Sequence, residues 1–272
     1  MNKIIVLLAL TLLVGGCSLH QAAPPPPAAA SAHVKIAFVK FPVLEYHMIG
    51  RPEGRWQRTP ENFRSDLEWL YANNYYPLNL RDLLDGFGSV PAGRRPVVLT
   101  FDDSTTGQFN YLPDGKLDPE SAAGILKAFH DKYPDWPLKA TFFVLVETSA
   151  PSHNLFGQPE LAGRKLRELS AWGMEIGAHT YSHDRLDKIS AAAARRSLDR
   201  ELATLAKFVS AEVVSLSVPE GKYPADLSVL AKFRLVTEVA GGLNPVKYDP
   251  LHIKRIQAID AEWRKFFRRG AG

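Results

Sequence analysis

Short apolar runs alternate with amphipathic segments along most of this chain, and this alternation restricts the possible folds more than any other feature. The apolar runs have the length of buried strands, and the segments between them have the spacing of surface helices. Strands that alternate with helices are typical of α/β proteins with a parallel sheet. The expected strands are residues 43–46, 97–101, 140–146, 174–178, 213–216 and 235–239.

The first expected helix has a recognisable start. Thr59 is a capping residue, Pro60 suits the first turn, and Phe63, Leu67 and Leu70 fall on one helical face. Six strand–helix alternations within residues 34–257, with no internal repeat, favour one complete or partly closed α/β barrel over two domains. Further helices are expected at residues 119–132, 160–172, 190–209 and 225–233.

The first 33 residues do not have the pattern of this domain. Lys3 and the apolar run that follows it are typical of a secretory signal peptide, residues 1–16, and the run is too short to span a bilayer. The chain's one cysteine, Cys17, ends a Val-Gly-Gly-Cys sequence that resembles a bacterial lipobox, which implies a lipid on Cys17. The alternative is an incidental cysteine in a cleaved signal. Residues 17–33 are rich in Pro and Ala, which predicts an extended tether.

We therefore expect an exported protein that a lipid anchors to the bacterial cell envelope, on the periplasmic face of the outer membrane if the host is Gram-negative. The residues after the tether, 34–257, would form the catalytic domain. The composition is that of a folded domain. A content of 46% hydrophobic and 23% charged residues with a single cysteine excludes a disordered chain and a disulfide scaffold.

Residues 262–272 contribute +3 of the net charge of +4, and they lie in a basic C-terminal tail, residues 258–272. The rest of the chain is nearly neutral and does not interleave basic with aromatic residues, so we expect no nucleic-acid partner. Trp263, Phe266 and Phe267 lie among the basic residues of the tail. They fit either an amphipathic end that touches anionic lipid or glycan, or a solvated helix end, which we favour.

Polar residues follow two of the expected strands directly. Asp102 and Asp103 come immediately after residues 97–101, where a pair of carboxylates is costly unless a cation or a proton neutralises it. Neighbouring residues of an extended chain point in opposite directions, so one can bind a metal while the other faces a different partner. A simple cap of the following turn is the alternative.

His179 and His183 follow the strand 174–178, and a spacing of four is typical of metal ligands if the backbone turns helical there. With a carboxylate from a parallel strand end they form an Asp-His-His set, which also serves iron oxygenases. A second carboxylate beside the set favours hydrolysis, because hydrolysis needs a base for the attacking water.

These motifs, Thr100-Phe101-Asp102-Asp103 and His179-Thr-Tyr-Ser-His183, resemble the first two motifs of the polysaccharide deacetylases, carbohydrate esterase family 4. Residues 140–144 and 175–177 fit the same family. The resemblance implies a distorted (β/α)7-8 barrel in a single domain and a divalent metal ion, for which zinc is the expected ion. It implies that Asp103, His179 and His183 hold the metal and that Asp102 is the general base.

The family usually has a third histidine that protonates the leaving amine, and two candidates compete for this role. His47 ends the first strand in a Tyr-His pair similar to the opening of the circularly permuted branch, which includes deacetylases of poly-β-1,6-N-acetylglucosamine. His252 follows Leu251 near the end of the domain and is similar to a motif of the unpermuted members. We favour His47, because it closes a strand in a barrel whose active face lies at the strand ends.

The third family motif differs in this chain. Where the family commonly has Arg-x-Pro-Tyr-Gly, residues 217–221 read Ser-Val-Pro-Glu-Gly. Pro219 and Gly221 preserve the turn, and the Glu220 N–H can still stabilise an oxyanion. We expect no arginine beside Asp102. The Glu220 side chain has three interpretations: selection of substrates with amines, lost activity, or a solvated turn.

The primary hypothesis is a lipid-anchored, metal-dependent hydrolase that removes N-acetyl groups from sugars of an envelope or exported polysaccharide. The alternatives are an O-acetyl esterase on a polysaccharide such as xylan, and a non-catalytic glycan-binding lipoprotein. Trp56, Trp136 and Trp172 are candidates for stacking on sugars, although core packing is the commoner role of tryptophan.

Overall fold

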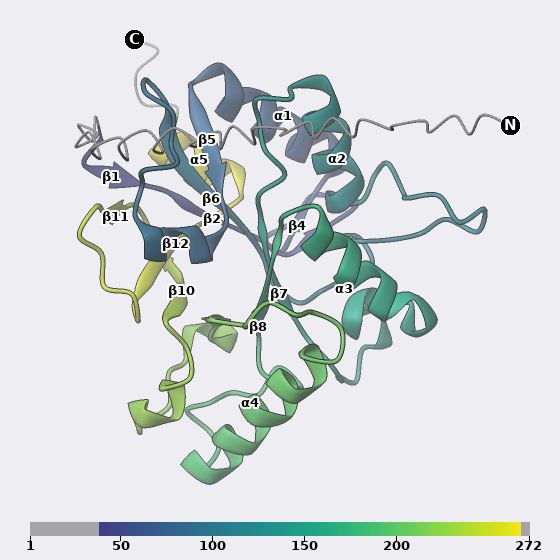
Figure 1. The fold of residues 1–272 in the computed structure, drawn as a ribbon, viewed down its shortest axis with the longest axis vertical. Coiled ribbons are helices and arrows are strands. Elements are labelled where there is room, and N and C mark those ends of the chain that lie inside the picture. The colour runs from purple at the N-terminus through teal and green to yellow at the C-terminus, as the bar shows by residue number, and fades with distance from the viewer. Residues whose placement is uncertain (1–37, 268–272) are drawn as a thin grey trace, which may run out of the picture. The chain divides into compact units, whose positions relative to one another are not determined.

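The computed structural model describes residues 38–267, and its centre is a closed ring of seven parallel strands (Figure 1). Each strand of the ring pairs with two neighbours. In order round the ring the strands are β2 (Val43–Tyr46), β12 (Ile253–Gln257), β10 (Leu235–Gly241), β9 (Ser215–Ser217), β8 (Glu175–Ala178), β7 (Thr141–Val144) and β6 (Arg95–Phe101). The pairings β12–β2 and β2–β6 close the ring, and β5 (Tyr75–Leu78) pairs with β6 outside it. The described residues belong to one unit, which confirms the prediction of a single barrel domain.

Five α-helices and two small strand pairs complete the described chain. The helices are α1 (Pro60–Ala72), α2 (Ala122–Lys132), α3 (Ala162–Ala171), α4 (Ala191–Leu205) and α5 (Asp260–Phe266). The small pairs are antiparallel β1 (Lys40–Phe41) with β11 (Asn244–Pro245), and parallel β3 (Met48–Ile49) with β4 (Gln57–Arg58). Within residues 38–267, no helix has the length and apolar character that crossing a membrane requires.

The start of α1 is as the sequence predicts. The Thr59 hydroxyl accepts a hydrogen bond from the Asn62 N–H at 3.2 Å, and Pro60 occupies the first turn. The three apolar residues of the predicted face, Phe63, Leu67 and Leu70, are fully buried. This helix is therefore fixed by a capping hydroxyl at its start and by burial of one face.

Two strands of the large sheet and one helix differ from the sequence predictions, and the two small strand pairs were also not predicted. β5 and β12 were not expected, because neither segment is a continuous apolar run. The helix predicted at 225–233 is wrong: the chain forms only a 3-10 turn, Leu227–Leu230. The Asp226 carboxylate caps the start of this turn by accepting from the Ser228 N–H.

The C-terminal segment packs on the domain through α5. The Trp263 side chain is buried, and its ring lies 5.7 Å from the Trp69 ring of α1 and 4.6 Å from the Phe267 ring. The expectation of a solvated helix end is therefore wrong for this part of the tail. The predicted signal peptide and tether lie outside the described residues.

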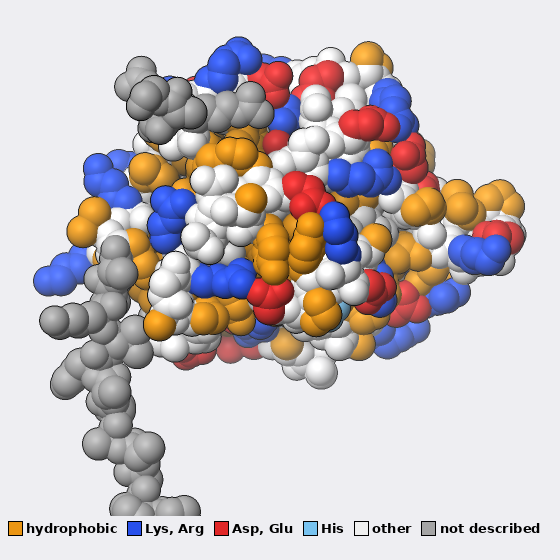
Figure 2. All heavy atoms as spheres, turned by 90° about the horizontal axis from the view of Figure 1, so that it is seen from above, with side chains coloured by type: hydrophobic (Ala, Val, Ile, Leu, Met, Phe, Trp, Pro, Cys, Tyr) orange, Lys and Arg blue, Asp and Glu red, His pale blue; other side chains and the backbone are white. Residues whose placement is uncertain are grey.

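Charged side chains of both signs are interspersed over the face drawn in Figure 2, apart from what the grey atoms cover. No continuous basic surface is present on the visible part of this face. This agrees with the nearly neutral charge of the chain outside its basic tail.

Candidate active site

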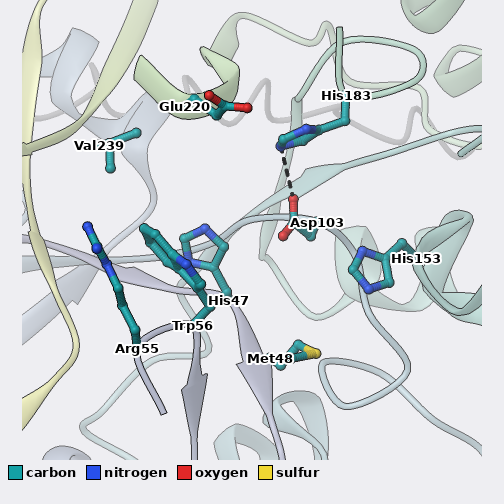
Figure 3. Close-up of a pocket in the computed structure, with 9 residues that line it drawn as sticks. All are labelled: His47, Met48, Arg55, Trp56, Asp103, His153, His183, Glu220 and Val239. Atoms are coloured by element: carbon teal, nitrogen blue, oxygen red, sulfur yellow. Dashed lines mark ion pairs between the residues drawn. The ribbon is translucent and has the colours of Figure 1, made fainter. Parts of the chain in front are cut away.

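The predicted site residues gather at one end of the barrel, because the carboxyl ends of parallel strands meet on the same face. β6 ends before Asp102 and Asp103, β8 before His179, and β2 before His47. A cavity of about 640 Å³ lies at this end of the barrel (Figure 3). The cavity is lined by His47, Met48, Arg55, Trp56, Asp103, His153, His183, Glu220 and Val239.

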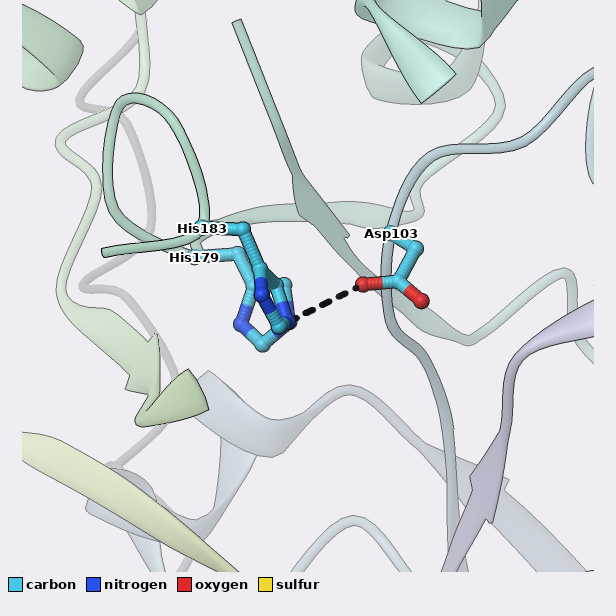
Figure 4. A group of neighbouring side chains, drawn as sticks. All are labelled: Asp103, His179 and His183. Carbon is cyan, nitrogen blue, oxygen red and sulfur yellow. Dashed lines mark ion pairs between the residues drawn. The ribbon is translucent and has the colours of Figure 1, made fainter. Parts of the chain in front are cut away.

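Asp103, His179 and His183 converge on one point (Figure 4). Asp103 Oδ1 lies 3.3 Å from His179 Nε2 and 3.6 Å from His183 Nε2. One ligand atom from each of the three residues lies within 4.8 Å of the others. Asp103 Oδ1 is buried and has no hydrogen-bond partner among the described residues. An unsatisfied carboxylate oxygen facing two imidazole nitrogens is the arrangement that a divalent cation fits.

The orientation of His179 leaves Nε2 free for a ligand. Its Nδ1 lies 2.7 Å from the carbonyl oxygen of Ser217, so we assign the ring proton to Nδ1, which donates to that carbonyl. When Nε2 has lost its own proton, its lone pair points towards Asp103. This matches the hydrogen bond that metal-binding histidines commonly make through their second nitrogen.

The turn between the two histidines is not the helical turn that their spacing of four would need to place them on one helical face. Thr180 and His183 both adopt left-handed backbone conformations, with φ of 63° and 60°. The Thr180 hydroxyl accepts from the Asp184 N–H at 2.6 Å and stabilises this turn. Asp103 is also left-handed, with φ of 75°. Such conformations cost about 1–3 kcal/mol each in non-glycine residues and are typical of functional sites.

The charges of the site favour a cation at this point. Burial would lower the pKa of His179, but the carboxylates of Asp102 and Asp103 outweigh it and raise the pKa to about 9. Burial would raise the pKa of Asp103, but His179 holds it below its usual value. A divalent ion that binds here must therefore displace a proton from His179.

Glu201 of α4 holds the backbone at His179. Its carboxylate is buried, and Oε1 accepts from the His179 N–H at 2.6 Å. Burial raises the pKa of Glu201 to about 8, and the hydrogen bond from the His179 N–H opposes this rise. Sequence reasoning missed this residue, because a glutamate about three turns into a helix has the pattern of a surface residue.

We expect Glu201→Gln to weaken divalent metal binding by about tenfold, because the amide is a poorer acceptor and positions the His179 backbone less firmly. Calorimetric metal titration measures this effect. The control is Glu175→Gln, since Glu175 is buried at the opposite end of β8 and accepts from the Ser215 hydroxyl at 2.7 Å. Equal metal affinity in the two variants would rule out this role.

Asp102 is paired with a buried arginine. Its carboxylate is buried and accepts two hydrogen bonds from Arg255 of β12, at 2.7 and 2.8 Å, and one from the Ser217 hydroxyl at 2.9 Å. Burial would raise the pKa of Asp102, but the Arg255 guanidinium holds it well below its usual value. The expectation that no arginine lies beside Asp102 is therefore wrong. Asp102 Oδ2 also lies 3.9 Å from His179 Nε2, next to the proposed metal position.

Arg255 also pairs with a second buried carboxyl group, that of Glu45, which sequence reasoning missed as well. Its Nη2 lies 3.2 Å from Glu45 Oε1, and this oxygen lies 3.8 Å from His47 Nε2. Burial raises the pKa of Glu45 to about 8, although Arg255 opposes the rise. The signal in the sequence was a glutamate within the apolar strand 43–46. Glu45 lies near both Arg255 and His47. The Arg255 guanidinium therefore connects Asp102, the predicted base, with His47, the predicted acid, by way of Glu45.

His47 lines the cavity as predicted, and its ring lies 4.6 Å from the ring of Trp56. Burial lowers its pKa, and the carboxylates of Asp102 and Asp103 oppose this shift. Gln108 Nε2 donates to the His47 carbonyl at 2.8 Å and also to the Asp102 carbonyl, so it ties the two strand ends together.

His252 is not among the residues that line the cavity. Its Nδ1 lies 3.1 Å from Glu238 Oε1, and its ring stacks on Tyr223 at 4.7 Å. The geometry therefore favours His47 over His252 as the candidate acid.

One of the three candidate tryptophans reaches the cavity. Trp56 is 40% exposed and lines it, whereas Trp136 is buried in the core and Trp172 stacks on Phe109 at 5.7 Å. His153, which was not predicted as a site residue, lies in the cavity wall near Asp103 (Figure 3).

The model of the family described as polysaccharide deacetylase matches residues 89–236, which is more than half of the chain. The chain belongs to the polysaccharide deacetylase family. This confirms the resemblance seen in the motifs. No curated protein has a significant match to the chain.

Solved structures with the same fold include three bacterial deacetylase-related proteins. The deacetylase PplD of Streptococcus pyogenes, solved in complex with acetate, is 24% identical with a TM-score of 0.62, and the alignment covers 80% of this chain and 92% of PplD. IcaB of Ammonifex degensii is 17% identical with a TM-score of 0.61, over 84% and 95% of the two chains. The deacetylase domain of BpsB from Bordetella bronchiseptica is 19% identical with a TM-score of 0.59, over 80% and 96%. IcaB and BpsB support the likeness to the circularly permuted branch at the level of the fold.

Proposed function

We propose that this protein is a metal-dependent hydrolase that removes N-acetyl groups from the sugars of an envelope or exported polysaccharide. The observation that carries the proposal is the convergence of Asp103, His179 and His183 at the mouth of the barrel, with Asp102 beside them. The family membership supports deacetylation of a polysaccharide.

The donor set favours zinc. Two imidazole nitrogens and one carboxylate oxygen are common zinc ligands and leave positions open for water and substrate. A divalent ion bound there polarises the acetyl carbonyl and lowers the pKa of water. The second carboxylate, Asp102, distinguishes this site from an oxygenase site with the same three ligands.

The protein groups around this point have separate tasks in the proposed reaction. Asp102 takes a proton from the attacking water, and Arg255 keeps the Asp102 carboxylate ionised and oriented. The Glu220 N–H, in the turn between Pro219 and Gly221, stabilises the negative charge that develops on the acetyl oxygen. His47 gives a proton to the nitrogen as the carbon–nitrogen bond breaks.

Acetate release tests the proposed function directly. Metal-loaded protein should release acetate from oligomers of chitin, β-1,6-linked N-acetylglucosamine or peptidoglycan, and should leave acetylated xylan largely intact. Release of acetate from acetylated xylan alone, or from none of these substrates, would contradict the proposal.

O-acetyl ester hydrolysis is the second candidate, and the state of His47 favours it. Burial lowers the pKa of this histidine, so less of it carries the proton that an amine leaving group needs. An ester has a better leaving group than an amide, so its hydrolysis depends less on a general acid.

We therefore expect His47→Ala to reduce amide hydrolysis by about 10²-fold or more and to affect ester hydrolysis much less. Initial rates on matched N-acetyl and O-acetyl sugars measure the difference. Equal losses on both substrates would show that His47 acts by shaping the cavity rather than by donating a proton.

We also propose that the protein is exported and anchored through a lipid on Cys17, which lies outside the described residues. The lipobox-like sequence supports this location. Cys17→Ser should release the protein from the membrane fraction, and an unchanged distribution would contradict the anchor.

A further inference from the structure

Glu220 is a cavity residue whose side chain the proposed reaction does not use. It lies in a tight turn between Pro219 and Gly221 and adopts a left-handed backbone conformation, with φ of 55°. The side chain is 51% exposed and lines the cavity beside His183 (Figure 3). A strained non-glycine residue with an accessible charge at an active site is an unusual feature that calls for a function.

An arginine holds one oxygen of the Glu220 carboxylate in place. Arg185 Nη1 donates to Glu220 Oε2 at 2.7 Å. The same guanidinium donates two hydrogen bonds to Asp187, both at 2.8 Å, and Lys188 Nζ lies 4.0 Å from Asp187 Oδ2, so two cations face these two carboxylates. No hydrogen bond among the described residues occupies Glu220 Oε1. The Glu220 carboxylate is therefore oriented by Arg185 through Oε2 and keeps Oε1 for a ligand.

Arg55 and Trp56 form the opposite wall of the cavity. Trp56 is 40% exposed there, and the Arg55 guanidinium lies 4.8 Å from its ring centre. Figure 3 shows Glu220 across the cavity from Arg55 and Trp56, with His47 beside Trp56 and Asp103 next to His183. A polysaccharide that places one sugar at Asp103 can therefore bring a neighbouring sugar to Glu220.

We propose that Glu220 recognises a protonated amine on a sugar next to the reacting one, so that the preferred substrate is a partly deacetylated polymer. This inference rests on the proposed function. Hydrolysis breaks the carbon–nitrogen bond, forms a carbon–oxygen bond from water, and leaves acetate and a primary amine that takes up a proton. Each turnover therefore creates the ammonium group that the Glu220 carboxylate attracts.

A charged carboxylate is suited to an ammonium in a way that an amide is not. A sugar hydroxyl can donate to Gln as well as to Glu, whereas an ammonium gains from the charge of Glu. Glu220→Gln keeps the size and the acceptor oxygen but removes the charge. Asp187→Asn is the matched control, because it removes a charge from the same arginine but does not line the cavity.

The test compares two ligands that the enzyme cannot deacetylate: a glucosamine tetramer and the corresponding glucose tetramer, in the β-1,6 and the β-1,4 linkage. Calorimetry with the metal-loaded protein at mildly acidic pH gives their affinities. We expect the wild type to bind one glucosamine tetramer about three- to tenfold more tightly than its glucose counterpart, with a smaller ratio at high ionic strength. Glu220→Gln should bring the ratio close to one, and Asp187→Asn should preserve it.

Equal affinity of the wild type for both tetramers in both linkages would overturn the inference, as would a preference that survives in Glu220→Gln. Neither result depends on catalysis. Failure of the proposed function would show instead as an absence of acetate release from N-acetylated oligomers, so the two failures are distinguishable.

Discussion

Asp102→Asn should leave the metal in place and reduce acetate release by about 10²- to 10⁴-fold, which is the usual contribution of a general base. Asn has the shape of Asp and can still accept from Arg255, but it cannot take a proton from water. Steady-state rates on N-acetylglucosamine oligomers measure the loss of activity. The metal content of the same preparation shows whether the metal stays bound. Full deacetylation by this variant would show that Asp102 is not the base.

A loss of stability must be separated from a loss of chemistry in this variant, because Asp102 neutralises a buried arginine. Asp66→Asn is the control. Asp66 is also buried and accepts two hydrogen bonds from an arginine, Arg58, at 2.7 and 2.9 Å, and it does not line the cavity. We expect the two variants to unfold at lower temperatures than the wild type, and only Asp102→Asn to lose turnover.

Asp103→Ala should abolish metal binding and activity together. It removes the only carboxylate of the three converging residues and leaves two imidazoles, one of which is 36% exposed. Metal titration should show a loss of affinity of at least about 10²-fold, since removal of a ligand costs more than the loss of a neighbouring hydrogen bond.

His153→Ala is the control for Asp103→Ala. His153 lies in the wall of the same cavity but does not belong to the converging group. It should bind metal as the wild type does. A variant lacking Asp103 that still binds the ion with wild-type affinity would place the metal elsewhere.

The sequence predicts most of the barrel strands because they are apolar enough to be recognised alone. It does not predict β12, where Arg255 lies between Lys254 and Ile256 in a segment that resembles an exposed edge. Arg255 is buried only because Asp102 and Glu45 arrive beside it from β6 and β2. Arg255 becomes buried only when the strands close into the barrel, and the sequence around Arg255 carries no information on that closure.

The same limit applies to the candidate site. The three converging residues are recognisable because each directly follows a strand or belongs to a short motif. The residues that support them are not: Arg255 lies 153 residues from Asp102, and Glu201 reaches His179 from the middle of α4. The left-handed turn at Thr180 also differs from the helical turn that the histidine spacing suggested. Long-range partners and local strain are properties of the folded chain.

The most direct test of this account measures bound divalent metal and acetate release on one preparation of the protein, before and after chelation and after the ion is returned. We predict one ion per chain, loss of acetate release from N-acetylglucosamine oligomers when the ion is removed, and recovery when it is restored. Undiminished acetate release by the metal-free chain would contradict the account.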